Sequence, residues 1–211
     1  GFDGTETRRD QRDWNAYQTT LSGALGKNGD NSDNSYHVIT GKGLTDATVL
    51  DGFTITDGNA NGEDYSWRSG GGLYCNGSGS GTQCSPTLRN LTFSDNYAKY
   101  GGAIYNDGTS GGVSSPMLTN VTFSRNTSDQ SGGAIYNGGS NGTSSPTLTN
   151  VIFSDNTSKN SDGGAIYNDS TQNGVCSPTL TDVIFSGNKA ASEGGAIYND
   201  GSKNGTCSPT L

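Results

Sequence analysis

The sequence predicts an all-β fold, a right-handed parallel β-helix in which about 31 residues form one coil and each coil carries three short strands. One observation is that the hexapeptide Gly-Gly-Ala-Ile-Tyr-Asn recurs at a constant interval, with copies that begin at Gly101, Gly132, Gly163 and Gly194. A second motif, Ser-Pro-x-Leu with a later Phe-Ser-x-Asn, recurs in step with it. Turn-forming residues separate the motifs, and no window has the apolar spacing of a helix.

The composition favours a thin core that is repeated along an axis. Of the 211 residues, 28% are hydrophobic and 34 are glycine, which has no side chain to bury. The formal net charge of −8 disfavours a nucleic-acid partner. No apolar run approaches the roughly 18 residues of a membrane-spanning helix, so we expect no transmembrane segment in this fragment.

We expect a single domain with an irregular start and a regular continuation. Residues 1–47 are predicted to form irregular cap coils, with strands at 19–21 and 37–40. Residues 48–211 are predicted to form the regular β-helix repeats. The last motif stops at Leu211 in mid-coil, so the chain reads as a fragment of a longer one, and its last coil would present an unpaired strand edge.

The regular coils share one order of elements, which residues 115–145 illustrate. Pro116 precedes the first strand, where a missing N–H is tolerated. Leu118, Val121 and Phe123 then alternate with polar residues, which is strand spacing. Paired glycines allow a tight corner with positive φ, and Ile135 follows on another strand. Equivalent residues of successive coils should form columns about 4.8 Å apart. The phenylalanine column would contain Phe93, Phe123, Phe153 and Phe185.

Asparagine recurs at two corners of the coil. Stacked Asn amides can bond to each other and to the turn backbone, so these residues predict structural ladders. The first ladder would contain Asn96, Asn126, Asn156 and Asn188, and the second Asn106, Asn137, Asn168 and Asn199.

The four cysteines predict two disulfides. Cys75 and Cys84 flank a short loop that a disulfide could close, and Cys176 and Cys207 hold the same position in successive repeats, as vertical neighbours would. Disulfides fit an oxidising, extracellular setting. A metal site is the alternative, but CxxC pairs are missing and His37 is the only histidine. We therefore predict no metal and no cofactor.

A tyrosine follows the inward isoleucine or leucine in each hexapeptide. Neighbouring residues of a strand face opposite sides, so these tyrosines should form an exposed stripe. The stripe is a candidate platform for sugars, a neighbouring subunit or a partner strand, and the alternative is that it only stiffens the sheet by stacking. Its members are Tyr74, Tyr105, Tyr136, Tyr167 and Tyr198.

We predict no catalytic residues. The recurring acids Asp107, Asp169 and Asp200 read as solvated turn residues, without a calcium-loop motif. Sugar hydrolysis needs two carboxylates at a set separation in a cleft, and a regular solenoid offers no obvious long loop to build one except that at 59–69. Glu63 and Asp64 in this loop are the best enzymatic candidates.

The combined motifs resemble a known group of surface proteins. Gly-Gly-Ala-Ile paired with Phe-x-x-Asn resembles the double signature of the chlamydial polymorphic outer-membrane proteins. The longer run Ser-Pro-Thr-Leu-Thr-Asn-Val-Thr-Phe-Ser-x-Asn is similar to repeats of large bacterial surface proteins. This resemblance implies a right-handed β-helix with a pectate-lyase-like fold on the cell surface, and it implies no particular activity.

The expected function is that of an extracellular, non-catalytic structural protein, either a rigid cell-surface rod or a filament subunit that assembles end to end. The alternatives are an adhesin or glycan-binding passenger domain, with glycans or host-surface molecules as partners, and a carbohydrate-active β-helix enzyme. The expected location is extracellular or on the cell surface.

Overall fold

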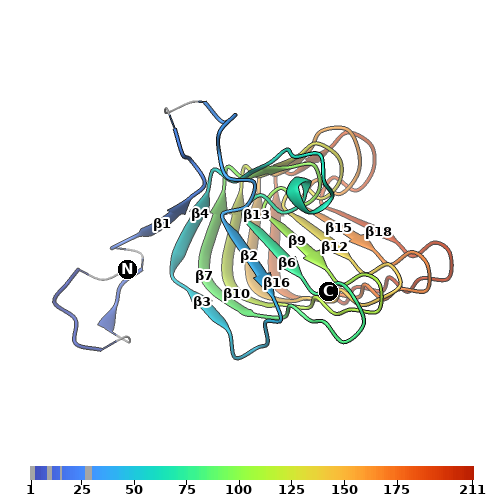
Figure 1. The fold of residues 1–211 in the computed structure, drawn as a ribbon, viewed down its shortest axis with the longest axis horizontal. Coiled ribbons are helices and arrows are strands. Elements are labelled where there is room, and N and C mark those ends of the chain that lie inside the picture. The colour runs from blue at the N-terminus through green and yellow to red at the C-terminus, as the bar shows by residue number, and fades with distance from the viewer. Residues whose placement is uncertain (1–2, 9–10, 15, 27–29) are drawn as a thin grey trace.

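The structure is a computed structural model that describes residues 3–8, 11–14, 16–26 and 30–211. It confirms a parallel β-solenoid with three strands per coil (Figure 1). The described strands pair in parallel with the equivalent strand of the next coil, and their registers place identical motif residues side by side. Parts of the predicted cap, at 1–2, 9–10, 15 and 27–29, lie outside the described residues, and the division at residue 47 stays a prediction.

Three sheets run along the solenoid. The long sheet contains β1 (Thr19–Ser22), β4 (Phe53–Thr56), β7 (Thr87–Ser94), β10 (Met117–Ser124), β13 (Thr147–Ser154) and β16 (Thr179–Ser186), with β3 (Val49–Asp51) also paired to β7. The short sheet contains β5 (Asn59–Ala60), β8 (Tyr97–Ala98), β11 (Thr127–Ser128), β14 (Thr157–Ser158) and β17 (Lys189–Ala190). The tyrosine sheet contains β2 (Ile39–Lys42), β6 (Leu73–Asn76), β9 (Ile104–Asp107), β12 (Ile135–Gly138), β15 (Ile166–Asp169) and β18 (Ile197–Asp200). A 3-10 turn, η2 (Ser66–Arg68), lies in the loop before β6.

The predicted phenylalanine column forms the centre of the core. Ring centroids of successive phenylalanines lie 5.2, 4.8 and 5.0 Å apart, with interplanar angles of 11° or less. Phe93, Phe123 and Phe153 are fully buried. Ile55 continues the column beside Phe93, and Leu21 lies beside Ile55. The core therefore depends on contacts between coils rather than within one coil.

The paired glycines serve two different needs at the corner before the tyrosine sheet. Gly132 has a φ of +70°, a conformation that side chains disfavour. Gly133 has an ordinary φ, but a Cβ there would lie 2.1 Å from the carbonyl oxygen of Gly164 in the next coil. The first glycine thus permits the turn, and the second permits the close approach of neighbouring coils.

The long strands contain a bend that the sequence reading did not identify. In the middle of each strand an Asn or Asp adopts a φ between 53° and 55°, which these two residue types tolerate better than others. The residues are Asn90, Asn120, Asn150 and Asp182. The amides of the first three form a third ladder on the outer surface, since Asn120 donates to Asn90 over 3.0 Å and Asn150 donates to Asn120 over 2.7 Å.

Candidate binding surface

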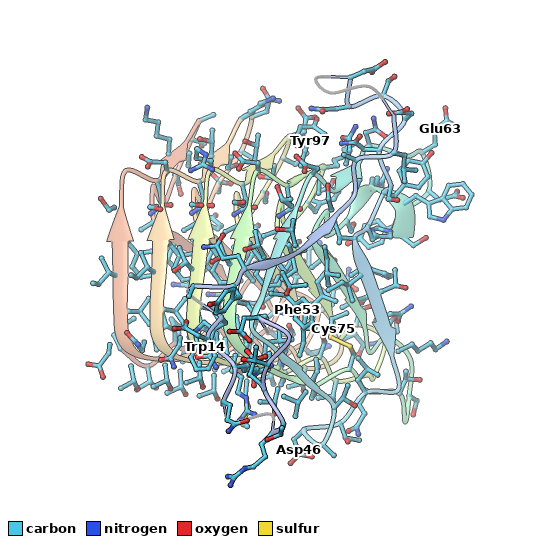
Figure 2. The ribbon with its side chains drawn as sticks, turned by 90° about the vertical axis from the view of Figure 1, so that its left-hand side faces the viewer. Trp14, Asp46, Phe53, Glu63, Cys75 and Tyr97 are labelled. Carbon is cyan, nitrogen blue, oxygen red and sulfur yellow. A yellow bond between two sulfur atoms is a disulfide. The ribbon has the colours of Figure 1, made fainter. Side chains whose placement is uncertain are left out.

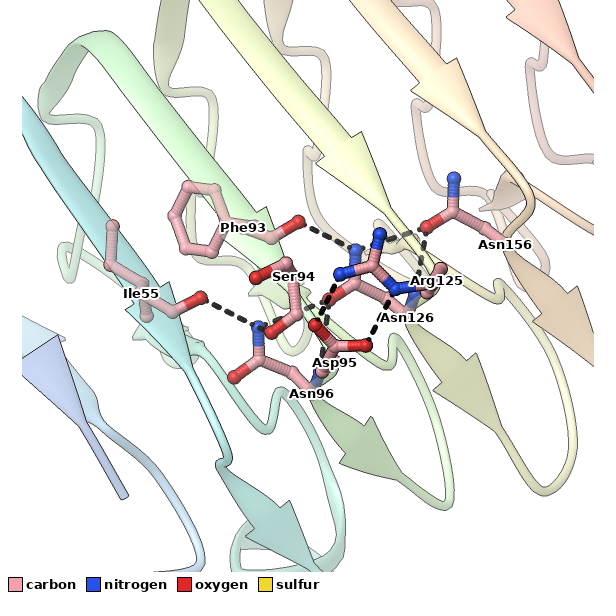
Figure 3. Close-up of polar contacts among 8 residues, drawn as sticks. All are labelled: Ile55, Phe93, Ser94, Asp95, Asn96, Arg125, Asn126 and Asn156. Atoms are coloured by element: carbon pink, nitrogen blue, oxygen red, sulfur yellow. Dashed lines mark hydrogen bonds and ion pairs between the residues drawn. The ribbon is translucent and has the colours of Figure 1, made fainter. Parts of the chain in front are cut away.

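Both predicted asparagine ladders are present, and they lie inside the coil rather than on a binding face. Asn96 donates from Nδ2 to the Oδ1 of Asn126 over 3.0 Å, and Asn126 donates to Asn156 in the same way (Figure 3). Each of these amides also donates to a core residue's carbonyl in the preceding coil, as Asn126 does to Phe93. In the second ladder, Asn106 donates to Asn137 over 2.8 Å. The first ladder satisfies backbone groups at its corner, and the second joins successive coils through its amides, so the role of both ladders is structural.

The structure contains the first of the two predicted disulfides. Cys75 and Cys84 are joined within one coil. Cys75 occupies the ladder position of Asn106, its partner in the register. A disulfide sulfur cannot donate as an amide does, and among the described residues the Oδ1 of Asn106 is buried without a hydrogen-bond partner. The disulfide thus ends the second ladder at the N-terminal side.

The second predicted disulfide, between Cys176 and Cys207, is not formed. The two thiols lie in neighbouring coils, next to the bridge between Val175 and Thr206. Within its own coil, Cys176 faces Asn168, which stands where the first pair has Cys75, so no cysteine is available for the same in-coil bond. Both residues are free thiols in this structure.

The two free thiols should differ sharply in reactivity. Burial raises the pKa of the Cys176 thiol well above its usual value, whereas the hydrogen bond from Cys176 lowers the pKa of Cys207. Because the thiolate is the reactive form, iodoacetamide at pH 8 should alkylate Cys207 first and Cys176 only after unfolding. Peptide mass spectrometry of timed samples measures this order. Equal labelling rates, or no labelling because a Cys176–Cys207 disulfide is present, would contradict it.

The five predicted tyrosines do stack into a column on the outer side of the tyrosine sheet. From Tyr105 to Tyr198, successive ring centroids lie 4.9, 5.0 and 5.1 Å apart, and Tyr74 lies 5.9 Å from Tyr105. The prediction that the whole column is exposed is wrong. Tyr74, Tyr105 and Tyr136 are 7%, 1% and 8% exposed, and only Tyr167 and Tyr198 are partly open.

Other aromatic rings cover the three buried tyrosines. His37 stacks on Tyr74 at 5.5 Å, and its Nδ1 lies 2.9 Å from the carbonyl oxygen of Gly70. Burial lowers the pKa of His37, which favours a neutral ring in this contact. His37 precedes β2 rather than lying in the strand predicted at 37–40.

Tyr65 and Tyr100 cover the next two rings of the column. Tyr65 packs edge-on against Tyr105 at 5.8 Å, and Tyr100 packs edge-on against Tyr136 at 5.7 Å. The loop that carries Tyr65 has no counterpart in the later coils, so the repeat pattern alone did not indicate this cover.

A missing aspartate explains where Tyr65 binds. The hydroxyl of Tyr74 donates to Asp107, and that of Tyr136 donates to Asp169, over 2.8 Å in both cases. The equivalent partner of Tyr105 would be residue 138, which is glycine. The Tyr105 hydroxyl instead lies 2.5 Å from the hydroxyl of Tyr65. The loop at 59–69 is thus anchored at a coil whose tyrosine lacks this aspartate.

Burial of the column predicts its behaviour in alkali. Burial is the largest cause of the raised pKa values of Tyr74, Tyr105, Tyr136 and Tyr167, and it raises that of Tyr65 to about 12. A raised folded pKa contributes stability that is present below the unfolded value, near 10, and is lost as the pH rises. The absorbance at 295 nm should therefore show these tyrosines ionising only together with loss of the β circular dichroism signal. Complete and reversible ionisation of all ten tyrosines below pH 11 would contradict this.

Among the residues that the structure describes, the most exposed aromatic contact lies beside the column rather than in it. Trp67 is 49% exposed and stacks on Tyr36, which is 40% exposed, with centroids 5.8 Å apart and an angle of 13°. We call this pair the Trp67 platform. Arg68 lies 5.2 Å from the ring of Tyr65, which fixes the base of the same loop. The platform offers a flat apolar surface that the sequence reading did not single out.

The surfaces around the tyrosine column and the Trp67 platform carry few side chains that could act in catalysis or bind a metal. Glu63 and Asp64 are exposed loop residues (Figure 2 labels Glu63). Across the ranges described, no three His, Cys, Asp or Glu side chains form a group that could hold a metal ion. No helix in the described part of the chain is long and apolar enough to span a bilayer.

Comparison with known families finds a match to a repeat family. The family model described as the Chlamydia polymorphic membrane protein (Chlamydia_PMP) repeat matches residues 90–107, 120–138, 150–169 and 182–200. Each matched segment runs from the bend of a long strand, through its asparagine corner, to the tyrosine sheet. Among curated proteins and among solved structures, none matches this chain significantly. The chain is thus a parallel β-solenoid in which four successive segments are similar to the repeat of the polymorphic membrane proteins.

Proposed function

We propose that this chain is a rigid, non-catalytic rod or spacer at the cell surface. The observation that carries the proposal is the continuous alignment of the core phenylalanines and of the two asparagine ladders through successive coils. Such columns couple each coil to its neighbours, and a stack of this kind resists bending because any bend would open several of them together.

The rod proposal is tested by lengthening the chain by one coil. A copy of residues 132–162 inserted after residue 162 should add about 4.8 Å to the solenoid axis without changing its cross-section. Small-angle X-ray scattering compares the two chains, and circular dichroism checks that the insert folds. A matched control inserts a Gly and Ser segment of the same length at the same place, which should disrupt the columns. If the coil copy gives a bent or expanded particle like the control, the proposal fails.

A filament is the more specific version of this proposal. Its support is the parallel register, since a second copy could continue the three sheets by the same pairing that joins adjacent coils. Sedimentation velocity from micromolar to millimolar concentration, followed by electron microscopy, tests it. Growing species and fibres would support end-to-end assembly, and a single monomeric species throughout would exclude it under those conditions.

The Trp67 platform favours an adhesin as the second candidate. A stacked, half-exposed Trp–Tyr pair provides the flat apolar area that sugars and partner proteins contact. A glycan array probed with the wild type and with Trp67→Ala tests it. Loss of a specific signal in the variant supports adhesion, and identical or blank arrays count against it. Tyr17→Ala, at another exposed aromatic residue, is the control.

A further inference from the structure

A separate groove crosses the outer face of the long sheet, away from the tyrosine sheet. It has a volume of about 870 Å³ and continues into a smaller hollow of about 210 Å³, since both share Trp14, Asn90 and Asn120 in their walls. One wall comes from the N-terminal segment and the other from β7, β10 and the residues around β3. Figure 2 looks onto this face and shows Trp14 near Phe53 in front of the strands.

A network of charges holds the N-terminal wall in place. Asp51 is 5% exposed and accepts hydrogen bonds from Arg89 over 2.8 Å and from Asn90 over 2.9 Å. Arg12 forms an ion pair with the same carboxylate and donates to the Asp51 carbonyl over 3.0 Å. Burial opposes ionisation of Asp51, but these hydrogen bonds together lower its pKa. The groove is thus a built site with fixed walls rather than a gap between loose segments.

Two features of the groove point to a ligand. Trp14 is 37% exposed, and the guanidinium carbon of Arg12 lies 5.7 Å from the centroid of its ring. Arg89 uses its Nε for Asp51, its side chain is 44% exposed, and among the described residues no partner contacts its two terminal nitrogens. An aromatic face and a guanidinium with unused parallel donors therefore share one groove.

The charge of the groove selects the ligand class. Among the residues that the structure describes, three arginines and one carboxylate line it, in a chain whose net charge is −8. In the other long strands, the position of Arg89 is occupied by Thr119, Thr149 and Thr181. The arginine is therefore specific to this coil. A guanidinium recognises a carboxylate through two parallel hydrogen bonds, while the Trp ring offers a flat surface to a sugar ring.

We propose that this groove binds an oligosaccharide that carries carboxylate sugars. Arg89 pairs with a sugar carboxylate through its terminal nitrogens, and Trp14 stacks against the adjacent ring. The exposed ladder amide of Asn120 lines the floor. The groove volume of about 870 Å³ lies within the range of typical ligand sites, about 300–1,000 Å³. This inference stands independently of the rod and of the Trp67 platform.

The two tryptophans make a direct test available. The only tryptophans of the chain are Trp14 and Trp67, so Trp67→Phe leaves Trp14 as the single tryptophan, and selective excitation of tryptophan then reports on the groove. The probe is a hyaluronan tetrasaccharide, which carries two glucuronates, titrated at pH 7 and 50 mM salt. We expect a saturable change in Trp14 emission. The methyl-esterified tetrasaccharide, which is neutral, should bind at least about tenfold more weakly because the charged hydrogen bonds are lost.

Two variants distinguish binding through Arg89 in the groove from a general effect of net charge. Arg89→Thr installs the residue that neighbouring coils already have, so it should fold, and it should weaken binding about tenfold or more. The double variant Arg89→Thr/Thr149→Arg restores the net charge on the same column but outside the groove, and it should remain weak. Circular dichroism and thermal unfolding check the fold of both.

Several results would overturn the proposal. They are no saturable emission change, equal binding of the methyl ester, wild-type binding by Arg89→Thr, or recovery in the double variant. Equal binding of a tetraglutamate peptide would assign the groove to acidic peptides instead and would also overturn the glycan assignment.

Discussion

Replacing Phe123 by alanine is expected to lower the free energy of unfolding by about 3–5 kcal/mol, the range for a fully buried phenylalanine. Its ring lies between Phe93 at 5.2 Å and Phe153 at 4.8 Å, so truncation removes both stacking contacts and leaves a cavity in the column. Urea unfolding followed by circular dichroism measures the loss. The matched control is Thr122→Ala, one residue earlier on the outward face, for which we expect a change of less than about 0.5 kcal/mol.

The Phe123→Ala variant should also destabilise the strands near the substitution more than those farther away. Each coil contacts only its neighbours, so hydrogen exchange should accelerate most in β7, β10 and β13 and least in β16 and β4. Equal destabilisation by the Phe123 and Thr122 variants would mean that the phenylalanine column does not hold the coils together.

Replacing Asn126 by alanine is expected to cost at least about 3 kcal/mol, because it leaves several buried polar groups without partners. Its Nδ2 donates to the Phe93 carbonyl and to Asn156, and its Oδ1 accepts from the backbone N–H and the amide of Asn96. Thermal and urea unfolding measure the effect. A loss below about 1 kcal/mol would show that water or neighbouring groups replace these bonds.

The outer ladder provides the control for this second prediction. Asn120 has a φ of +55° and an exposed amide, so Asn120→Gly removes the side chain while keeping a residue suited to that backbone. We expect a loss of less than about 1 kcal/mol. Comparable losses at Asn126 and Asn120 would contradict the conclusion that burial makes the inner ladder important.

Features that repeat along the chain could be predicted from the sequence, because identical residues at constant spacing can only fall into columns once the coils stack. This applies to Phe123, to Asn126 and to the positive φ of Gly132. The third ladder could also have been found, since Asn90, Asn120 and Asn150 recur at one position, but an asparagine inside a strand gives no sign of its φ.

Features that lie outside the repeat could not be predicted from the repeat pattern. The tyrosine column was predicted, but its burial depends on Tyr65 and His37, which belong to segments without later copies. The bond of Cys75 to Cys84 lies within a coil, whereas Cys176 has Asn168 at the corresponding place. The Trp14 groove depends on an ion pair between Arg12 and Asp51, which lie far apart in the chain, and no local pattern indicates it.

Because successive coils are nearly identical, the length of such a chain can evolve by whole coils. A gain or loss of one whole coil by recombination between similar gene segments preserves every column, because the hexapeptides of the tyrosine sheet recur at one constant interval. An insertion shorter than one coil is tolerated only at the corners of a coil. The interval from Phe153 to Phe185 is slightly longer than that from Phe123 to Phe153, yet all three rings stay in register, so a corner absorbs the difference. Lineages should therefore differ in steps of one coil, each changing the length of the solenoid by about 5 Å.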